Sequence, residues 1–455
     1  VGGIDDFMVM GFSTMVIAAD SAIHLGAENG ISSGDFNDDG VADLAIGADQ
    51  GGYYAEGMVW LMDGSTPWSL VGTPMATSYA RVSGSAAGNY FGAMGPKQVD
   101  LIAGGAADLV VAGTDALDGH AMCLFDGAMM DGPQNCTDAY ARWVGADDDY
   151  PHVISHLDYN GDGVAELFYA DSWASASDTG KVYAFSGADI TAGEHDLLAD
   201  NDWRIDGRHA YDYVGSQLSG GDINADGYDD LFIGAYGDDH PHPKTGSVFV
   251  FLGGAGSTTP VRIAQFDKDA HIYGSETNAM VGRYSGSSIA DVNGDGSNDF
   301  VVSSPGSESV HVFFDASLMV GGGYDTDSAD ISIHGTEEAD WFGIGMAVGD
   351  LDGDGFADLA IGAPDENSPG SGTADSEGHV YIFFGAEIET STMTAADAGA
   401  HFRGRANQDS FGALIRSGFD MNLDGREDLV ISAPGNTLTT SDGGQVHVLL
   451  MPSGR

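Results

Sequence analysis

"DFNDDGVAD", residues 35–43, runs directly into the apolar stretch "LAIGA" of residues 44–48. The same pattern, D-x-[DN]-x-D-G-x-x-[DE] followed by an apolar run, returns at 158–166, 222–230, 291–299, 350–358 and 420–428. A degenerate copy lies at 100–108, and successive copies start 58 to 70 residues apart. Self-similarity at a near-constant period indicates a repeat architecture.

Each period also carries the same set of strand signals. An apolar or aromatic residue with glycine precedes most copies, as at Phe342-Gly343, and a buried-type run such as 358–364 follows. A Gly-x-Val-x-x-Phe segment comes next, as at 378–383, and then a short run that ends in glycine, as at 400–404. Alternating β-branched and aromatic residues between glycines indicate strands, and no helical period of useful length appears. Seven repeats of four antiparallel strands predict an all-β, seven-bladed propeller.

The two ends of the chain are expected to close the ring. Residues 22–455 are predicted to form a single propeller, and residues 1–21 an N-terminal segment of uncertain role. The last repeat stops after its third strand, at 446–450, and residues 22–26 match the fourth-strand pattern. Pairing of these two segments would remove the free sheet edges. Residues 7–10 resemble a further third strand, either a remnant of a longer repeat array or an extra edge strand. The first residue is Val rather than Met, so we interpret the chain as mature or truncated.

The spacing inside the repeated loop predicts a calcium site. Ca²⁺ takes six to eight hard oxygen ligands, and glycine at position 6 allows the sharp turn that brings alternate residues toward one ion. Positions 1, 3, 5 and 9 would supply side-chain oxygens, and position 7 its backbone carbonyl. The predicted ligands are Asp35, Asn37, Asp39, Val41, Asp43, Asp158, Asn160, Asp162, Val164, Glu166, Asp222, Asn224, Asp226, Tyr228, Asp230, Asp291, Asn293, Asp295, Ser297, Asp299, Asp350, Asp352, Asp354, Phe356, Asp358, Asp420, Asn422, Asp424, Arg426 and Asp428.

Two other interpretations of the loop fit the sequence less well. An EF-hand needs a bidentate Glu at position 12 between helices, but position 12 of the first loop is Ile46 within a strand-like run. Simple Asp-Gly turns would connect strands without a metal, but they do not require four aligned oxygen positions in six copies. We therefore predict about six Ca²⁺ sites that are structural in role. Ile102 and Gly104 stand at ligand positions in the degenerate copy, which predicts no metal there.

The net charge of the chain excludes some classes of binding partner. Seventy Asp and Glu against 15 Lys and Arg give a net charge of −55. Such a polyanion repels nucleic acid and anionic membranes, and no apolar run is long enough to span a bilayer. Cys123 and Cys136 are spaced for a disulfide in an oxidising compartment, and two reduced cysteines remain the alternative.

Two common catalytic motifs are missing from the sequence, which contains no His-Glu-x-x-His and no Gly-x-x-x-x-Gly-Lys. The segment 238–242, Asp-Asp-His-Pro-His, could bind a transition metal, although a solvated loop is the preferred interpretation. Packing is the preferred role for Trp173 and Trp341. A non-enzymatic role is therefore expected, and a glycosidase pair among the many carboxylates is neither recognised nor excluded by sequence.

The combination of Phe-Gly, the acidic loop, Gly-Ala-Pro (362–364) and Val-Tyr-Ile-Phe (380–383) resembles the FG-GAP repeat of integrin α-subunit propellers and their bacterial relatives. The resemblance runs from about residue 22 to the C-terminus. Repeat 1 departs from it by lacking Phe-Gly, and repeat 5 has Ser303-Ser304-Pro305 instead of Gly-Ala-Pro. The resemblance implies calcium loops on one face and partner binding on the opposite face. The long connections at 49–56, 171–179, 236–245 and 364–377 would lie on that opposite face.

The expected function is an extracellular adhesion or recognition module, secreted or at the cell surface, that binds a protein or glycan. One alternative is a catalytic or non-catalytic domain of a secreted hydrolase acting on polysaccharide or phospholipid. Another is a structural surface protein that assembles with itself. The assignment to recognition rests on the family resemblance, since fold alone does not fix function.

Overall fold

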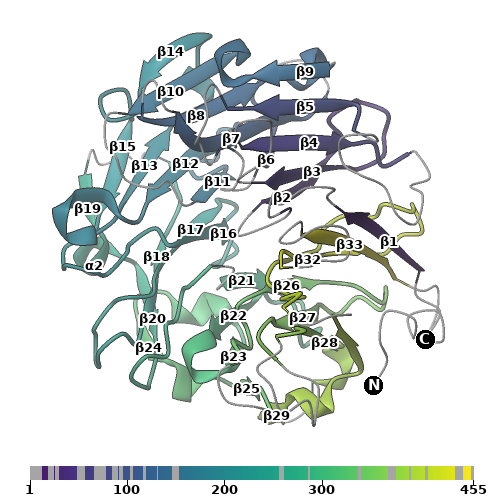
Figure 1. The fold of residues 1–455 in the computed structure, drawn as a ribbon. Helices are drawn as coiled ribbons and strands as arrows, with labels where there is room; N and C mark the ends of the chain where they lie inside the picture. The colour runs from purple at the N-terminus through teal and green to yellow at the C-terminus, as the bar shows by residue number, and fades with distance from the viewer. Residues whose placement is uncertain are drawn as a thin grey trace.

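A computed structural model describes residues 13–18, 25, 30–48, 57–65, 78–84, 91, 96–102, 106–115, 119–130, 132–145, 153–255, 261–284, 287–336, 340–366, 376–388, 391–404, 408–435 and 444–451. Within these residues the strands form seven sheets, which are arranged around a central axis (Figure 1). Each sheet starts at the axis and follows chain order outwards, except that the last sheet ends on an N-terminal strand. The predicted seven-bladed, all-β propeller is therefore confirmed.

The strands occupy equivalent places in each blade. The first strands, nearest the axis, are β2 (Ile31–Gly34), β6 (Lys97–Val99), β11 (Val153–Leu157), β16 (Gln217–Gly221), β21 (Ser287–Ala290), β26 (Met346–Gly349) and β31 (Ile415–Arg416). The second strands are β3 (Asp43–Ala48), β7 (Asp108–Asp115), β12 (Glu166–Asp171), β17 (Asp230–Ala235), β22 (Asp299–Ser304), β27 (Asp358–Ala363) and β32 (Leu429–Ala433).

The outer strands follow in the same order. The third strands are β4 (Met58–Met62), β8 (Gly119–Phe125), β13 (Lys181–Phe185), β18 (Ser247–Phe251), β23 (Ser309–Phe313), β28 (His379–Phe383) and β33 (Gln445–Leu450). The fourth strands are β5 (Ala80–Ser83), β10 (Ala141–Gly145), β15 (Trp203–Asp206), β20 (Ala270–Tyr273), β25 (Ile331–His334), β30 (Ala400–Arg403) and β1 (Ser13–Ala18).

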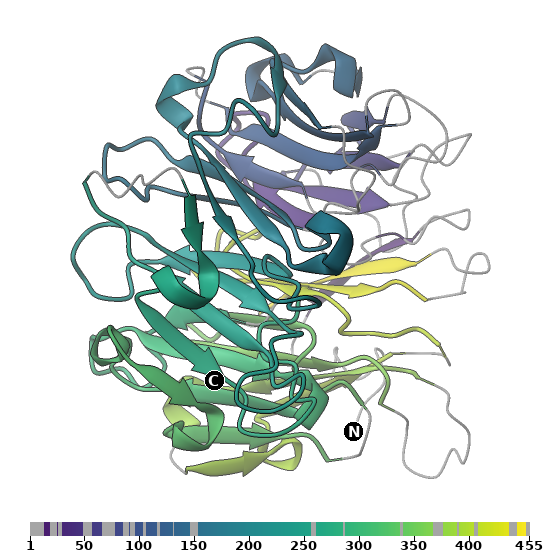
Figure 2. The same ribbon diagram turned by 90° about the vertical axis from the view of Figure 1, so that its left-hand side faces the viewer.

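The core lies between the blades. In the side view the sheets stand next to one another around the ring, so each turns its two faces toward its neighbours (Figure 2). Buried apolar residues gather in clusters that each join two adjacent blades, including one that joins the last blade to the first. A second strand such as β27 is buried at every residue, because neighbouring blades cover both of its faces. This explains the continuous apolar run behind each acidic loop.

Five blades have a fifth strand that the sequence analysis missed. The connection between the third and fourth strands of one blade adds a short parallel strand to the outer edge of the preceding blade. These strands are β9 (Gly132–Asn135), β14 (Gly193–Asp196), β19 (Val261–Ile263), β24 (Gly323–Asp325) and β29 (Thr392–Thr394). They are only three or four residues long and most are polar, so their sequences carry little strand signal, but they cover edges that would otherwise be open.

An N-terminal strand closes the ring, but not the predicted one. β1 pairs antiparallel with β33 in a six-residue register from Ser13 opposite Leu450 to Ala18 opposite Gln445. The prediction that 22–26 forms this strand is wrong, because Leu25 bridges Ala48 of the first blade instead. A Cβ on Gly444 would lie 2.7 Å from the Leu25 backbone nitrogen. Residues 7–10 lie outside the described residues.

Leu25 therefore takes the place that Phe411 holds in the last blade. A Cβ on Gly378 would lie 2.3 Å from both the backbone nitrogen and oxygen of Phe411. The backbone of Leu25 lies against Gly444 as that of Phe411 lies against Gly378. Leu25 and Phe411 are both fully buried. Repeat 1 thus has a counterpart of Phe-Gly, which the sequence analysis missed because leucine replaces the aromatic residue.

Helices are short in the described part of the chain. The α-helix is α2 (Ala264–Asp267). Other helical turns are η2 (Gly127–Met129), η3 (Cys136–Asp138), η4 (Ala174–Asp178), η5 (Gly187–Asp189), η6 (Pro305–Ser307), η7 (Ala316–Met319), η8 (Thr326–Ser328), η9 (Gly385–Glu387) and η10 (Ala395–Asp397). Among the described residues, no helix has the length and apolar character needed to cross a membrane.

Candidate functional site

The six acidic loops recur at one end of the blades. Each joins the first strand of its blade to the second, as 222–230 joins β16 to β17 and 350–358 joins β26 to β27. The residue at position 9 starts the second strand, as Asp230 and Asp358 do, or directly precedes it. Because the blades repeat around one axis, the six loops share one face of the propeller.

Backbone amides donate hydrogen bonds to the carboxylates at positions 1 and 5 of each loop. The position 1 side chain accepts a hydrogen bond of 2.7 to 3.0 Å from the amide of the position 6 glycine in all six loops. The position 5 side chain accepts one of 2.8 to 3.2 Å from the position 7 amide. The loop therefore bends around its own carboxylates, as the glycine at position 6 predicted.

The carboxylate at position 9 has a second task that spacing alone did not reveal. In the sixth blade, Asp358 is fully buried and accepts hydrogen bonds of 2.8 Å from the amides of Leu351 and Gly385. The first amide belongs to the acidic loop and the second follows the third strand. This carboxylate therefore ties the loop to the rest of its blade. Acceptors for buried amides are needed whether or not a metal is bound.

Three carboxylate groups of the acidic loop lie close together in the sixth blade. One oxygen each of Asp350, Asp352 and Asp358 lies within 4.8 Å of the other two. In the third blade, Asp158 Oδ1 is buried and has no hydrogen-bond partner among the described residues. Asn160 occupies position 3 of that loop, and its Nδ2 donates a 2.6 Å hydrogen bond to Glu166. The donor set, hard oxygens with a buried oxygen lacking a partner, fits a cation such as Ca²⁺.

Burial raises the pKa of every position 9 carboxyl group. Loss of solvation is the largest cause, and the other loop carboxylates add to it, so the pKa of Asp358 and of Glu166 rises to about 7. The pKa of Asp43, Asp230, Asp299 and Asp428 rises to about 6 for the same reasons. The loops thus hold several negative charges close together at a cost in free energy that a bound cation would offset.

Neighbouring loops are joined through their backbones. The amide at position 8 of one loop donates to the carbonyl at position 1 of the preceding loop, at 3.2 Å for Asp229 to Asp158 and 3.3 Å for Glu427 to Asp350. Side-chain patterns could not predict these bonds, because they involve only the backbone. The loops therefore form a connected series along part of the ring.

The degenerate loop keeps the buried carboxylate and loses the ligand pattern. Asp108 is fully buried and accepts hydrogen bonds from the amides of Leu101 (2.8 Å), Ile102 (2.6 Å) and Gly127 (3.2 Å). Residue 104 lies outside the described residues. Position 9 thus has the same anchoring role in a loop that is not expected to bind metal.

Aromatic residues gather at the other end of the blades. The connections 171–179 and 236–245 follow the ends of β12 and β17, whereas the acidic loops precede the same strands. The predicted connections 49–56 and 364–377 lie wholly or largely outside the described residues. The aromatic arc, as we call it, comprises Trp173, Tyr213, Tyr236, Arg283, Tyr284 and Trp341.

The members of the aromatic arc contact one another in sequence from the third blade toward the sixth. Tyr213 lies 6.0 Å from Trp173 and stacks on Tyr236 at 4.8 Å, measured between ring centroids. The Arg283 guanidinium lies 5.3 Å from the Tyr236 centroid and 4.7 Å from that of Trp341. Trp173 is 44 % exposed and contacts Tyr213, so its side chain both packs on a neighbour and lines the surface.

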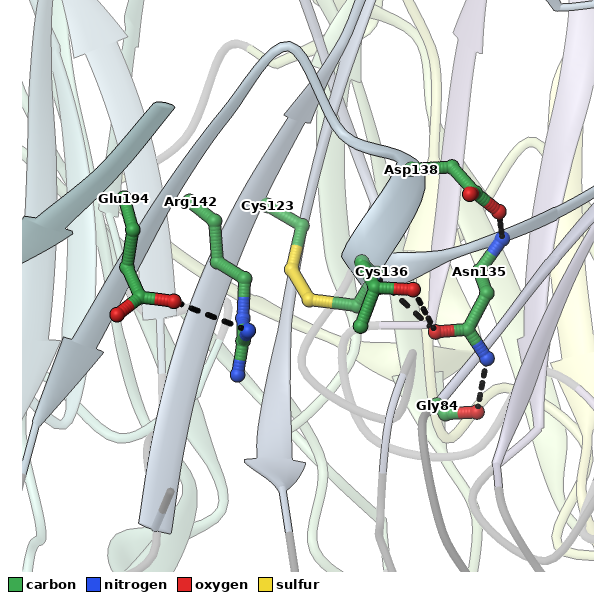
Figure 3. The surroundings of a disulfide bond; sticks show 8 residues. Gly84, Cys123, Asn135, Cys136, Asp138, Arg142 and Glu194 are labelled. Atoms are coloured by element: carbon green, nitrogen blue, oxygen red, sulfur yellow. Dashed lines mark hydrogen bonds and ion pairs between the residues drawn. A yellow bond between two sulfur atoms is a disulfide. The ribbon is translucent and has the colours of Figure 1, made fainter. Parts of the chain in front are cut away.

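The two cysteines lie on neighbouring segments of the second blade. Cys123 belongs to β8 and Cys136 starts η3, and their sulfur atoms are joined with the Cα atoms 5.8 Å apart (Figure 3). Asn135, the last residue of β9, donates a 2.9 Å hydrogen bond to the carbonyl of Gly84 (Figure 3). The disulfide thus ties the strand that crosses to the first blade back to its own blade.

Comparison with known families supports the repeat assignment. A family model described as "FG-GAP repeat" matches residues 29–62, 214–251, 342–383 and 411–449. A second model, described as "FG-GAP-like repeat", matches residues 291–361. The matched segments contain the acidic loops of the first, fourth, fifth, sixth and seventh blades.

Similar proteins of two kinds are found. The chain is 30 % identical over 241 residues to a phosphatidylinositol-glycan-specific phospholipase D of Dictyostelium discoideum, covering 48 % of this chain and 25 % of that protein. It is 36 % identical over 111 residues to integrin alpha-M of Mus musculus, covering 23 % and 9 %. It is 27 % identical over 271 residues to integrin alpha-PS5 of Drosophila melanogaster, covering 56 % and 24 %. The alignments thus span a quarter or less of these relatives.

Proposed function

Because this chain is an integrin-α-like FG-GAP β-propeller, we propose that it is a calcium-binding recognition module that holds a protein or glycan partner outside the cell or at its surface. The observation that carries the proposal is the aromatic arc at the end of the blades opposite the acidic loops. In this proposal, metal bound in the acidic loops stabilises the blades at one face, and the aromatic arc at the other face binds the partner.

Calcium is the proposed ion for the six acidic loops. Each loop offers side-chain oxygens from positions 1, 3, 5 and 9, and Ca²⁺ prefers oxygen ligands in larger and more flexible shells than Mg²⁺. Amides already orient the carboxylates at positions 1 and 5, so binding requires little rearrangement. The ion would relieve repulsion among carboxylates and stabilise the loop that connects the two innermost strands of its blade.

The aromatic arc has the composition of a recognition surface. Aromatic side chains and arginine are enriched at the energetically important positions of protein interfaces, and flat rings supply contact area at low entropic cost. Trp173 is 44 % exposed and Tyr284 39 % exposed, and both lie next to partly buried members of the arc that support them. Such rings can stack on the apolar faces of sugars or on side chains of a protein partner.

An extracellular location is supported by the cysteine pair. Disulfides persist in oxidising compartments and are rare in the cytosol. The disulfide joins Cys123 and Cys136, and both are buried. The integrin relatives are consistent with a role at the cell surface.

Two measurements test this proposal. Thermal unfolding with excess Ca²⁺ and then with EGTA, together with metal analysis, should give a large calcium-dependent rise in midpoint and about six Ca²⁺ per chain. Screening against glycan and protein arrays should then give a partner whose binding is lost in Trp173→Ala and kept in Leu318→Ala, an exposed residue outside the arc. Calcium binding without a partner that depends on Trp173 would refute the recognition role alone.

A second candidate is a domain of a larger hydrolase. It is favoured by similarity to proteins named phosphatidylinositol-glycan-specific phospholipase D from Dictyostelium discoideum and Rattus norvegicus. Incubation of the purified chain with a glycosylphosphatidylinositol-anchored protein and a panel of glycan substrates separates the two. Turnover that survives in Trp173→Ala would favour the hydrolase.

A further inference from the structure

A second group of metal-ligating side chains lies at the end of β17 opposite the acidic loop 222–230. That loop ends where β17 begins, whereas Asp238 follows the end of β17 at Ala235. His209 and Asp212 come from the connection between β15 and β16. One ligand atom each of His209, Asp212 and Asp238 lies within 4.8 Å of the other two. We call these three residues the histidine cluster.

The two carboxylates of the histidine cluster are more deeply buried than most acidic side chains. Asp212 is 1 % exposed and Asp238 3 % exposed, whereas the His209 side chain is 59 % exposed. Asp239 and Lys268 line the same cavity. Asp239 is exposed to solvent, whereas Asp212 and Asp238 are buried and carry two negative charges when ionised. Buried charges are normally paired or coordinate a metal, and one divalent cation would balance these two carboxylates.

Neighbouring polar groups already orient these carboxylates. Ser247 Oγ donates a hydrogen bond to Asp238 Oδ2, and His271 Nε2 lies 2.8 Å from the same Oγ. Asp212 Oδ2 accepts hydrogen bonds from Gln265 Nε2 (2.7 Å) and from the amide of His209 (3.2 Å). Partners of this kind position the ligands of a metal and are needed for full affinity.

The cluster faces a cavity of about 440 Å³. Phe249 and Phe266 form apolar parts of its lining, and His240 offers a further imidazole. A metal held by three protein ligands would therefore keep open positions directed toward a space large enough for water and a small ligand. Structural metal sites are closed by four protein ligands, so this arrangement is an open one.

We propose that His209, Asp212 and Asp238 form a site for one divalent transition metal, with Zn²⁺ as the best-matched ion, separate from the acidic loops. One imidazole and two carboxylates suit Zn²⁺, whereas Ca²⁺ prefers oxygen ligands alone. Asp340 and Asp409 stand at the equivalent position before Phe-Gly in the sixth and seventh blades and are also buried. Among the described residues, neither belongs to a comparable group with histidine. The site is therefore a property of the fourth blade.

The test uses the full chain saturated with Ca²⁺, so that the acidic loops are occupied. Co²⁺ is added as a spectroscopic probe, and Zn²⁺ is then titrated to displace it, with calorimetry as a second readout. We expect one equivalent of Co²⁺ with visible ligand-field absorption, displaced by one equivalent of Zn²⁺. His209→Ala should weaken Zn²⁺ binding by about tenfold or more. The His209 side chain is largely exposed, so this variant should fold.

His242→Ala is the matched control, because His242 is exposed in the same region but lies outside the cluster. It should bind Zn²⁺ as the unmodified chain does. Ser247→Ala should weaken binding less than His209→Ala, since Ser247 only orients Asp238. Equal Zn²⁺ affinity of the His209→Ala variant and the unmodified chain would overturn the proposal, and so would equal losses in the His209 and His242 variants.

Discussion

The backbone carbonyl of Asp291 accepts a 2.9 Å hydrogen bond from the amide of Ala357, which belongs to the acidic loop of the next blade. Asp291 is the first predicted ligand of its own loop, so its position depends on the order of the neighbouring loop. The same bond joins Asp35 to Ala107 at 2.9 Å. Metal bound in one loop should therefore help to order the adjacent one.

Replacement of a single ligand should lower the effect of calcium on stability. Asp39→Asn removes the charge at position 5 of the first loop, so we expect the loss of one of about six Ca²⁺ per chain and a smaller rise in melting temperature with Ca²⁺. Asp38→Asn is the control, because Asp38 lies beside Asp39 in the same loop and is also exposed, but is not a predicted ligand. Metal analysis and thermal unfolding measure both effects, and identical behaviour of the two variants would contradict the assigned ligands.

Removal of the buried carboxylate from the degenerate loop should destabilise the fold to the same extent with and without calcium. Asp108→Ala deprives three amides of their acceptor. Since hydrogen bonds to charged groups contribute about 1.5–3 kcal/mol each, we expect the free energy of unfolding to fall by about 3 kcal/mol or more. Denaturant unfolding with Ca²⁺ and with EGTA should give the same loss. Asp126→Ala removes one amide acceptor and should cost about 1 kcal/mol.

The contact between Gly378 and Phe411 should not tolerate a methyl group. Gly378 has φ +78°, and a Cβ there would lie 2.3 Å from backbone atoms of Phe411. Gly321 has φ +79° with nothing within 4 Å of its Cβ position, so it isolates the conformational cost. We expect Gly321→Ala to lower the free energy of unfolding by about 1–2 kcal/mol and Gly378→Ala by clearly more, or to prevent folding. Equal losses in denaturant unfolding would show that the backbone contact is looser than described.

The disulfide should contribute to stability through the unfolded state. Cys123 and Cys136 are 13 residues apart, and closing a loop of about 15 residues contributes about 3 kcal/mol in the chain-entropy account. The double variant Cys123→Ser, Cys136→Ser should lose about this amount in denaturant unfolding and should no longer respond to reductant. A reductant effect that persists in the double variant would place the sensitivity elsewhere.

Buried histidine should make stability depend on pH below neutrality. Burial lowers the pKa of His311 from 6.5 to about 4, and His334 adds to this effect while Asp327 opposes it. Between these values the unfolded chain binds more protons than the folded chain, so the contribution of His311 is complete above about pH 6.5 and is lost as the pH falls toward 4. His311→Gln should flatten the pH dependence of the melting temperature in this interval. His242→Gln, at an exposed position, should leave it unchanged.

The features that repeat in side chains were predictable from sequence. The acidic loops, the apolar second strands and the Gly-x-Val-x-x-Phe strands recur with residue types that only a few structures explain, and they predicted the blades correctly. Leu25 and β1 were missed, because one apolar residue or a six-residue strand resembles many other segments. The fifth strands were missed because backbone pairing alone places short polar segments such as β24 against the next blade.

The candidate sites were also predictable only where their residues follow a regular spacing in the sequence. Spacing in the acidic loops predicted ligand positions, but not the anchoring role of Asp108 or Asp358, because amides on a different strand connection also bind these carboxylates. The segment 238–242, which the sequence analysis singled out, contains only one member of the histidine cluster, Asp238. His209 and Asp212 lie well before them in the sequence, and only the packing of the third blade against the fourth brings the three ligands together.

The pairing of β1 with β33 has a consequence for how the protein is made. The ribosome releases Ser13–Ala18 long before it adds Gln445–Leu450, so the strand that seals the ring must wait until the other strands of the propeller have been synthesised. Until then its apolar residues have no partner strand, and a second nascent chain could capture them. Assembly during translation therefore depends on β1 staying free of wrong partners, and the emergence of β33 decides when the ring becomes complete.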